Sequence, residues 1–211
     1  MTIILTATDD TLACAWQQHC GDLENVCVHR GSILDVDCDV VVSPANSFGF
    51  MDGGIDMLYS QHFGWKVQER LQSQIRDKHH GELLVGLAEI VETDNLRIPF
   101  LIAAPTMRVP MKLQDTVNPY LAARAVLLLV QHGSFDQGTF AGERIADAVK
   151  SIAFPGLATG IGGIGPQTCA HQVRVAIDEI LLGKATFPHT WADASERHQK
   201  LYTDRVRNLQ W

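Results

Sequence analysis

The stretch that decides the fold is DVVVSPANSFGFMDGGID, residues 39–56. Three consecutive valines that stop at Ser43-Pro44 predict a buried strand with an abrupt end. The glycine-containing segment that follows predicts a loop, because glycine carries a conformational cost inside a helix or strand. A helix is expected from Ile55. Backbone N–H groups at such a helix start can face an anion, although an ordinary strand-to-helix turn fits the spacing equally well.

A second stretch repeats this arrangement near the other end of the chain. Residues 151–155 predict the last buried strand, residues 156–166 hold the densest run of glycines, and residues 167–182 predict a helix with one apolar face. Two glycine loops at adjacent strand ends could clamp a diphosphate, because glycine lets the backbone approach phosphate oxygens closely. The second loop matches GxGxxG literally, but no strand ending in an acidic residue follows its helix, so a dinucleotide-binding Rossmann unit is not expected.

The remaining pattern predicts an α/β layered architecture. Apolar runs predict strands, helical spacing predicts helices, and Asn118-Pro119 is expected to supply the N-cap and first residue of one helix. The other strands are expected at 3–5, 26–28, 39–43, 83–91 and 100–104, and the other helices at about 12–19, 55–63, 66–79 and 193–206, with a polar surface excursion at 131–144.

Length and composition narrow the class of protein. The 211 residues are 46% hydrophobic and 19% charged, which is typical of one globular domain. A net charge of −7 argues against a broad nucleic-acid-binding face. The five cysteines form no CxxC pair and are expected to be reduced core residues, and His79-His80 is expected to be a polar helix end. Without a signal peptide or an apolar run of membrane-spanning length, the chain is expected to be cytoplasmic.

Three motifs resemble those of macro domains. SPANSFGFMDGGID (43–56) is similar to their ribose and phosphate loop, FPGLATGIGGIGP (154–166) is similar to their second phosphate loop, and Gly31-Ser32-Ile33 stands where the family usually has Gly-Asp-Ile. The resemblance covers roughly residues 26–182 and is nearest to the phage-tail-associated bacterial subgroup. It implies a three-layer α/β/α fold with a mixed, mostly parallel central sheet. The whole chain, 1–211, would be one domain with a core at about 26–182, an N-terminal β-α addition at 1–25 and a C-terminal helical tail at 186–211.

The resemblance also implies a function and a site. Macro domains bind ADP-ribose, and many hydrolyse ADP-ribosyl esters, ADP-ribose 1''-phosphate or O-acetyl-ADP-ribose. Asn46 would hydrogen-bond the distal ribose, and Asp56 matches the acid that positions or activates water, so these two are the candidate catalytic residues. The expected partner is ADP-ribose or an ADP-ribosylated substrate, with no cofactor, metal, nucleic acid or membrane. The candidate ligand-binding residues are Ser32, Ile33, Ala45, Gly53, Gly54, Ile55, Ala158, Thr159, Gly160, Ile161, Gly162, Gly163 and Ile164.

Departures from the family pattern leave two alternatives open. Ser32 replaces the aspartate that recognises adenine, Asp52 replaces a glycine, and Gly162 replaces the aromatic that covers the distal ribose, a space that Phe48 or Phe50 could fill. These changes favour a non-catalytic ADP-ribose reader or a phage-associated accessory module. The other alternative is a divalent cation held by Asp52 and Asp56, for which two carboxylates are a thin basis. Of the late aromatic residues, Phe187 and Trp191 are expected to pack in the core.

Overall fold

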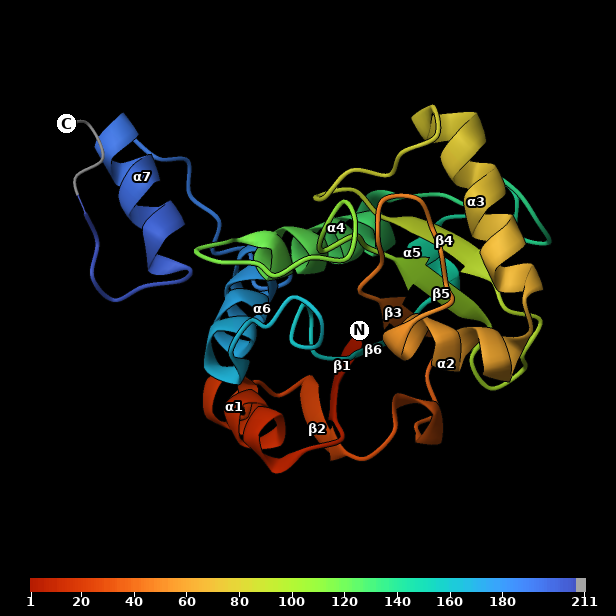
Figure 1. Ribbon diagram of the computed structural model, residues 1–211, viewed down its shortest axis with the longest axis horizontal. Helices are drawn as coiled ribbons and strands as arrows, with labels where there is room; N and C mark the ends of the chain where they lie inside the picture. Colours follow the sequence, from red (N-terminus) through yellow and green to blue (C-terminus); the bar gives the residue numbers. More distant parts are fainter. Residues whose placement is uncertain (208–211) are drawn as a thin grey trace.

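A single mixed sheet organises the residues that the computed structural model describes, 1–207. Within them the sheet has six strands in the order β2-β1-β6-β3-β5-β4 (Figure 1). All neighbouring strands are parallel except β4, which runs antiparallel to β5 at one edge. The predicted mixed, mostly parallel sheet is therefore confirmed. The strands are β1 (Thr2–Ala7), β2 (Val26–Arg30), β3 (Val40–Ser43), β4 (Glu89–Glu92), β5 (Phe100–Ala103) and β6 (Ser151–Phe154).

Helices cover both faces of this sheet, as the three-layer prediction requires. Buried side chains of α1, α4 and α6 pack on one face, and those of α2 and α3 pack on the other. Helix α7 stands apart from the layers (Figure 1). The helices are α1 (Asp10–Cys20), α2 (Gly54–Phe63), α3 (Lys66–His79), α4 (Asn118–His132), α5 (Ile145–Ala148), α6 (Pro166–Ile180) and α7 (Trp191–Lys200), with a short 3-10 helix at Ile33–Asp35.

The three valines of β3 show why this sequence makes a central strand. Val40 and Val42 point into the core under α1, α4 and α6, whereas Val41 points into the core under α2 and α3, and none of the three is exposed to solvent. Successive strand side chains alternate between the faces of a sheet, so an unbroken apolar run fits a strand that is covered on both sides. β3 is accordingly flanked by β6 and β5.

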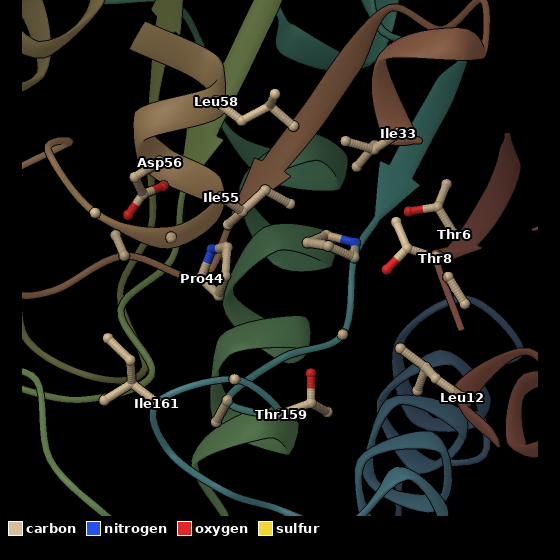
Figure 2. Close-up of a pocket in the computed structure, with 18 of the residues that line it drawn as sticks. Thr6, Thr8, Leu12, Ile33, Pro44, Ile55, Asp56, Leu58, Thr159 and Ile161 are labelled. Atoms are coloured by element: carbon tan, nitrogen blue, oxygen red, sulfur yellow. The ribbon is translucent and has the colours of Figure 1, made fainter. Parts of the chain in front are cut away.

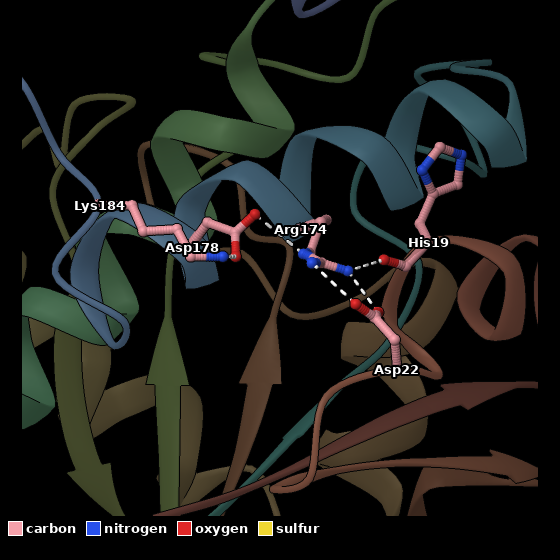
Figure 3. A network of polar contacts seen from close by, with 5 residues as sticks. All are labelled: His19, Asp22, Arg174, Asp178 and Lys184. Carbon is pink, nitrogen blue, oxygen red and sulfur yellow. Dashed lines mark hydrogen bonds and ion pairs between the residues drawn. The ribbon is translucent and has the colours of Figure 1, made fainter.

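Helix α1 is held at both of its ends. Asp9 caps its N-terminus by accepting a hydrogen bond from the Leu12 amide at 2.9 Å, and Gly21 is its C-cap. Beyond the C-cap, the Arg174 guanidinium of α6 donates to both carboxylate oxygens of Asp22, at 2.5 and 3.1 Å (Figure 3). The same side chain donates to Asp178 at 2.9 Å. Arg174 thus links α1 to α6.

Several predicted elements need correction. The strand predicted at 83–91 is confined to β4, because Gly86 turns the chain with φ +95° and the Leu83 amide bonds the Ser47 carbonyl instead of a neighbouring strand. Asn118 is not an N-cap: Val117 holds that position, and the Asn118 side chain donates to the Thr106 carbonyl at 2.7 Å. Helix α7 ends at Lys200 and is shorter than predicted.

Predictions of burial were also partly wrong. Phe187 and Trp191 are 89% and 70% exposed, so they do not pack in the core, because the segment that carries them lies outside the layers. Cys14 and Cys27 are exposed, whereas the other three cysteines are buried as expected. Phe135 in the predicted polar excursion is buried and packs on Phe100 with ring centroids 5.0 Å apart. None of the described helices has the length and apolar character to span a membrane.

Candidate functional site

A cavity of about 440 Å³ lies at the carboxyl ends of β1, β3 and β6. The chain leaves β3 toward α2 on one face of the sheet and leaves β6 toward α6 on the other. Ligands of open α/β sheets bind at such a divergence between neighbouring strands. The first glycine loop (44–53), which follows β3, and the second glycine loop (155–165), which follows β6, both contribute to the wall.

Most of the predicted site residues do meet in this cavity. Asn46 and Asp56, the candidate catalytic residues, both line it. Figure 2 shows Ile55 and Asp56 at the start of α2. The predicted ligand-binding residues that line it are Ser32, Ile33, Ala45, Gly53, Gly54, Ile55, Ala158, Thr159, Gly160 and Ile161. The sequence therefore predicted residues of this cavity in three separate segments of the chain.

The end of the second glycine loop does not line this cavity. Gly162, Gly163 and Ile164 were predicted to bind the ligand, but the loop folds back after Ala158, which has φ +58°, and the Ile164 amide bonds the Ala158 carbonyl at 3.1 Å. Gly163 and Ile164 instead line a separate cavity of about 260 Å³, and the Gly162 carbonyl accepts from the Leu113 amide. The part of the cavity wall that the second glycine loop supplies thus ends at Ile161.

The sequence did not identify the part of the wall that β1 and α1 supply. Thr6, Thr8 and Leu12 line the cavity across from Asp56 (Figure 2), and Asp9 lines it as well. They lie before residue 26 and so outside the resemblance. The predicted first strand offered a signal for this part of the site. In a parallel sheet the carboxyl end of that strand lies at the same edge as the two glycine loops. Met107 and Pro110, from the loop after β5, had no comparable signal.

Gly156 lies where the second glycine loop meets α1, two segments that both line the cavity. A Cβ at this position would stand 2.8 Å from Leu12 Cδ2 and would also collide with the Thr159 hydroxyl. A Cβ here would require the Thr159 and Leu12 side chains to shift, so glycine lets the second glycine loop lie close against α1. The close approach of backbone to side chain at Gly156 therefore helps to fix the position of Thr159 in the wall.

Asp56 is the buried acid of the site. Its side chain is 8% exposed, and the Ser43 hydroxyl donates to its carboxylate at 2.5 Å. Burial raises the pKa of Asp56 to about 6, against the opposing effect of the Ser43 hydrogen bond. Figure 2 shows Asp56 and Ile55 on different sides of the first turn of α2, with Ile55 directed toward Ile33. A carboxyl with a pKa near neutrality can exchange a proton with water during a reaction.

The side chain of Asn46 is largely engaged by its own loop. Its Nδ2 donates to the Phe50 carbonyl at 2.8 Å, and its Oδ1 accepts from the amides of Phe48 at 3.1 Å and Phe50 at 3.3 Å. A carboxamide has two N–H donors and two acceptor lone pairs. One N–H of Asn46 is therefore left for any other partner.

The charged residues of the wall are all acidic. Asp9, Asp52 and Asp56 line the cavity, and no lysine or arginine does so among residues 1–207. A bound anion would therefore depend on backbone N–H groups rather than on cationic side chains. Over the same residues, no group of three or more histidine, cysteine, aspartate or glutamate side chains is placed to hold a metal ion. His79 meets Glu89 at 2.7 Å, consistent with a polar helix end.

Comparison with known proteins agrees with this geometry. The family model described as Macro domain matches residues 42–173, which include both glycine loops. The chain belongs to the macro domain family. It is 31% identical over 153 residues to an uncharacterised protein of Aquifex aeolicus, covering 72% of this chain and 79% of that protein. It is 26% identical over 188 residues to a macro domain-containing protein of Caldanaerobacter subterraneus, covering 88% of this chain and 98% of that protein.

Solved macro domains share the fold at lower identity. The macrodomain of Mycobacterium tuberculosis DarG aligns with a TM-score of 0.57 at 17% identity, covering 72% of this chain and 88% of that one. A variant of the Oceanobacillus iheyensis macrodomain, solved with ADPR, aligns with a TM-score of 0.56 at 20% identity, covering 79% and 83%. The family model confirms the predicted family, these structures share its fold, and the phage-tail-associated subgroup stays a prediction.

Proposed function

We propose that this macro domain binds ADP-ribose, or a close derivative, in the cavity at the carboxyl ends of β1, β3 and β6. The observation that carries this proposal is the convergence of both glycine loops and buried Asp56 on one cavity of about 440 Å³. The volume lies within the range of small-molecule sites. The Oceanobacillus iheyensis macrodomain, which has this fold, has been solved with ADPR and with ADP.

We propose further that Asp56 makes the site hydrolytic. With a pKa raised to about 6, its carboxyl is mostly ionised at pH 7 and can accept a proton from water. In this scheme the water oxygen bonds to the electrophilic centre of an ester or phosphate at the distal ribose. The bond to the leaving oxygen breaks with its electron pair on that oxygen, which then takes up the proton that Asp56 accepted from water, and the carboxylate is restored. Holding the substrate and the water together in the cavity supplies much of the rate acceleration over the uncatalysed reaction in solution.

A non-catalytic reader is the second candidate, and two observations favour it. The carboxylate of Asp56 already accepts the Ser43 hydroxyl, and exposed Asp52 adds a negative charge to the wall where a phosphorylated ligand would lie. A reader would bind ADP-ribose without Asp56-dependent turnover. The phage-associated accessory role, a cytoplasmic location and the single domain over 1–211 are proposals of the same standing.

Calorimetric titration with ADP-ribose, with AMP and NAD as comparison ligands, tests the binding proposal. ADP-ribose is expected to bind saturably and with higher affinity than AMP or NAD. The absence of such binding would refute the proposal. Turnover of ADP-ribose 1''-phosphate and O-acetyl-ADP-ribose would then be compared between the wild-type protein and Asp56→Asn. Loss of turnover with retained binding supports hydrolysis. Binding without any turnover in the wild type would assign the reader function.

A further inference from the structure

The first glycine loop is anchored on both sides of one outward-facing aromatic residue, Phe50. The Ser47 amide donates to the Arg108 carbonyl at 3.1 Å, and the Ser47 carbonyl accepts from Leu83 at 2.8 Å. Met51, 1% exposed, donates its amide to the Gln68 side chain at 2.7 Å. Phe50 lies between these anchors but is 55% exposed and lines the cavity.

The backbone next to Phe50 is equally constrained. Gly49 is buried with φ +67°, and a Cβ there would stand 2.8 Å from the Ile75 side chain of α3. An L-residue at this position would be strained in conformation and would also collide with the helix. The loop is therefore pressed against α3, which leaves its next side chain, Phe50, directed away from the core.

Asn46 completes this arrangement by holding Phe50 directly. Its carboxamide bonds both the amide and the carbonyl of Phe50, at 3.3 and 2.8 Å. These two bonds and the bond to the Phe48 amide occupy three of its four hydrogen-bonding positions. Two of the four hydrogen-bonding positions of Asn46 thus hold the backbone from which the phenyl ring of Phe50 projects.

We infer that Phe50 is the residue through which the first glycine loop contacts the ligand, and that Asn46 is a positioning residue that acts through Phe50. An exposed aromatic ring at a cavity wall, on a backbone that is held in place, offers a flat apolar face, which suits the carbon face of a sugar or base. This role differs from the one that the family resemblance implies for Asn46, which is direct contact with the distal ribose. The inference rests on the proposed ADP-ribose site and names how that site selects its ligand.

A double-mutant cycle on ADP-ribose affinity tests this assignment. Asn46→Ala and Phe50→Ala are each expected to raise the calorimetric Kd by about tenfold, and the double variant by no more than about fifteenfold, because both remove the same contact. Phe50→Tyr should stay within about twofold of the wild type, since it keeps the ring. If Asn46 contacted the ligand itself, the losses would multiply to about one hundredfold, and the inference would be overturned. An unchanged Kd in Phe50→Ala would also overturn it.

Ile161 provides the matched control. It is 54% exposed and lines the same cavity from the second glycine loop. Asn46→Ala and Ile161→Ala should be additive in free energy, because Asn46 bonds Phe48 and Phe50 rather than the second loop. If Asn46→Ala fails to fold, Asn46→Ser replaces it in the cycle, because it removes the carboxamide that bonds Phe50 without a change of charge and keeps a hydroxyl that can accept from the Phe48 amide. Failure of the wild type to bind ADP-ribose would instead refute the proposed function, and the wild-type titration shows this before any variant is compared.

Discussion

Replacing Asp56 by asparagine should make the protein more stable at neutral pH. The folded state keeps this carboxyl buried, which raises its pKa from 3.8 to about 6. The folded protein therefore binds a proton on Asp56 at a higher pH than the unfolded chain does. Below about pH 4 both states are protonated and the group adds no penalty. As the pH rises through about 6, the folded state must hold a buried charge, and stability is lost.

The size of this loss follows from the difference between the two pKa values. A separation of about two units corresponds to a free energy of about 3 kcal/mol above pH 6. Asp56→Asn removes the charge and keeps an oxygen that can accept the Ser43 hydrogen bond. Its free energy of unfolding at pH 7.5 should exceed that of the wild type by about 1 to 3 kcal/mol, the lower figure allowing for the buried amide donor that asparagine introduces.

Urea denaturation at pH 5.0 and pH 7.5 measures the effect. Trp16 is fully buried and donates to the Thr6 carbonyl, so its fluorescence should report global unfolding. Asp52→Asn is the matched control: Asp52 lines the same cavity but is exposed, and its replacement should change stability by less than about 0.5 kcal/mol. Equal stabilities of Asp56→Asn and the wild type at pH 7.5, with equal dependence on pH, would refute the reasoning that burial destabilises the ionised carboxylate.

Three other predictions follow from packing and charge. Gly156→Ala should lower the free energy of unfolding by about 1 to 3 kcal/mol and weaken ADP-ribose binding, because the added Cβ displaces Thr159. Gly165→Ala is the control: its Cβ would meet no atom within 4 Å, so the loss should be less than about 1 kcal/mol. Urea unfolding measures the stability of the two variants, and calorimetry measures their affinity for ADP-ribose. Arg174→Met should cost about 1 to 2 kcal/mol because the partly buried guanidinium donates to the His19 carbonyl and to Asp178 as well as to Asp22, and equal midpoints of urea unfolding in the variant and the wild type would contradict it. Raising NaCl from about 0.05 to 0.5 M should change the ADP-ribose Kd by less than about threefold, because no cationic side chain lines the cavity within residues 1–207, and a steeper dependence would point to Lys or Arg contacts.

The elements that the sequence predicted well are those with a local physical cause. Helix α3 begins and ends where predicted, because its apolar residues recur every four positions and His80 adopts a left-handed C-cap conformation. The strand β3 was equally predictable, since three β-branched residues that stop at Pro44 favour a short buried strand over a helix. The N-cap prediction for Asn118 was wrong because its side chain donates to a tertiary partner, the Thr106 carbonyl, which no local pattern specifies.

The site was predictable where its residues belong to the loops and not where the sheet brings distant segments together. The register that pairs Leu5 with Phe154 places the end of β1 beside the second glycine loop, and this pairing spans most of the chain. Thr8 and Leu12 therefore enter the wall through a contact that sequence spacing does not encode. The burial of Asp56 has a similar origin, because it depends on how closely α2 approaches Ser43.

The acidic wall makes the two glycine loops the basis for any anion binding here. Three aspartates and no lysine or arginine line the cavity within residues 1–207, so a diphosphate would enter against side-chain charge. Gly53, Gly54 and Gly160 line it as well, and none of the three has a side chain to block the approach of phosphate oxygens to the backbone. Backbone N–H groups are fixed dipoles whose strength depends on geometry. Binding would therefore depend on contacts such as Gly156 with Leu12 that hold the loops in place, which is why packing residues outside the motifs should matter as much as the motifs themselves.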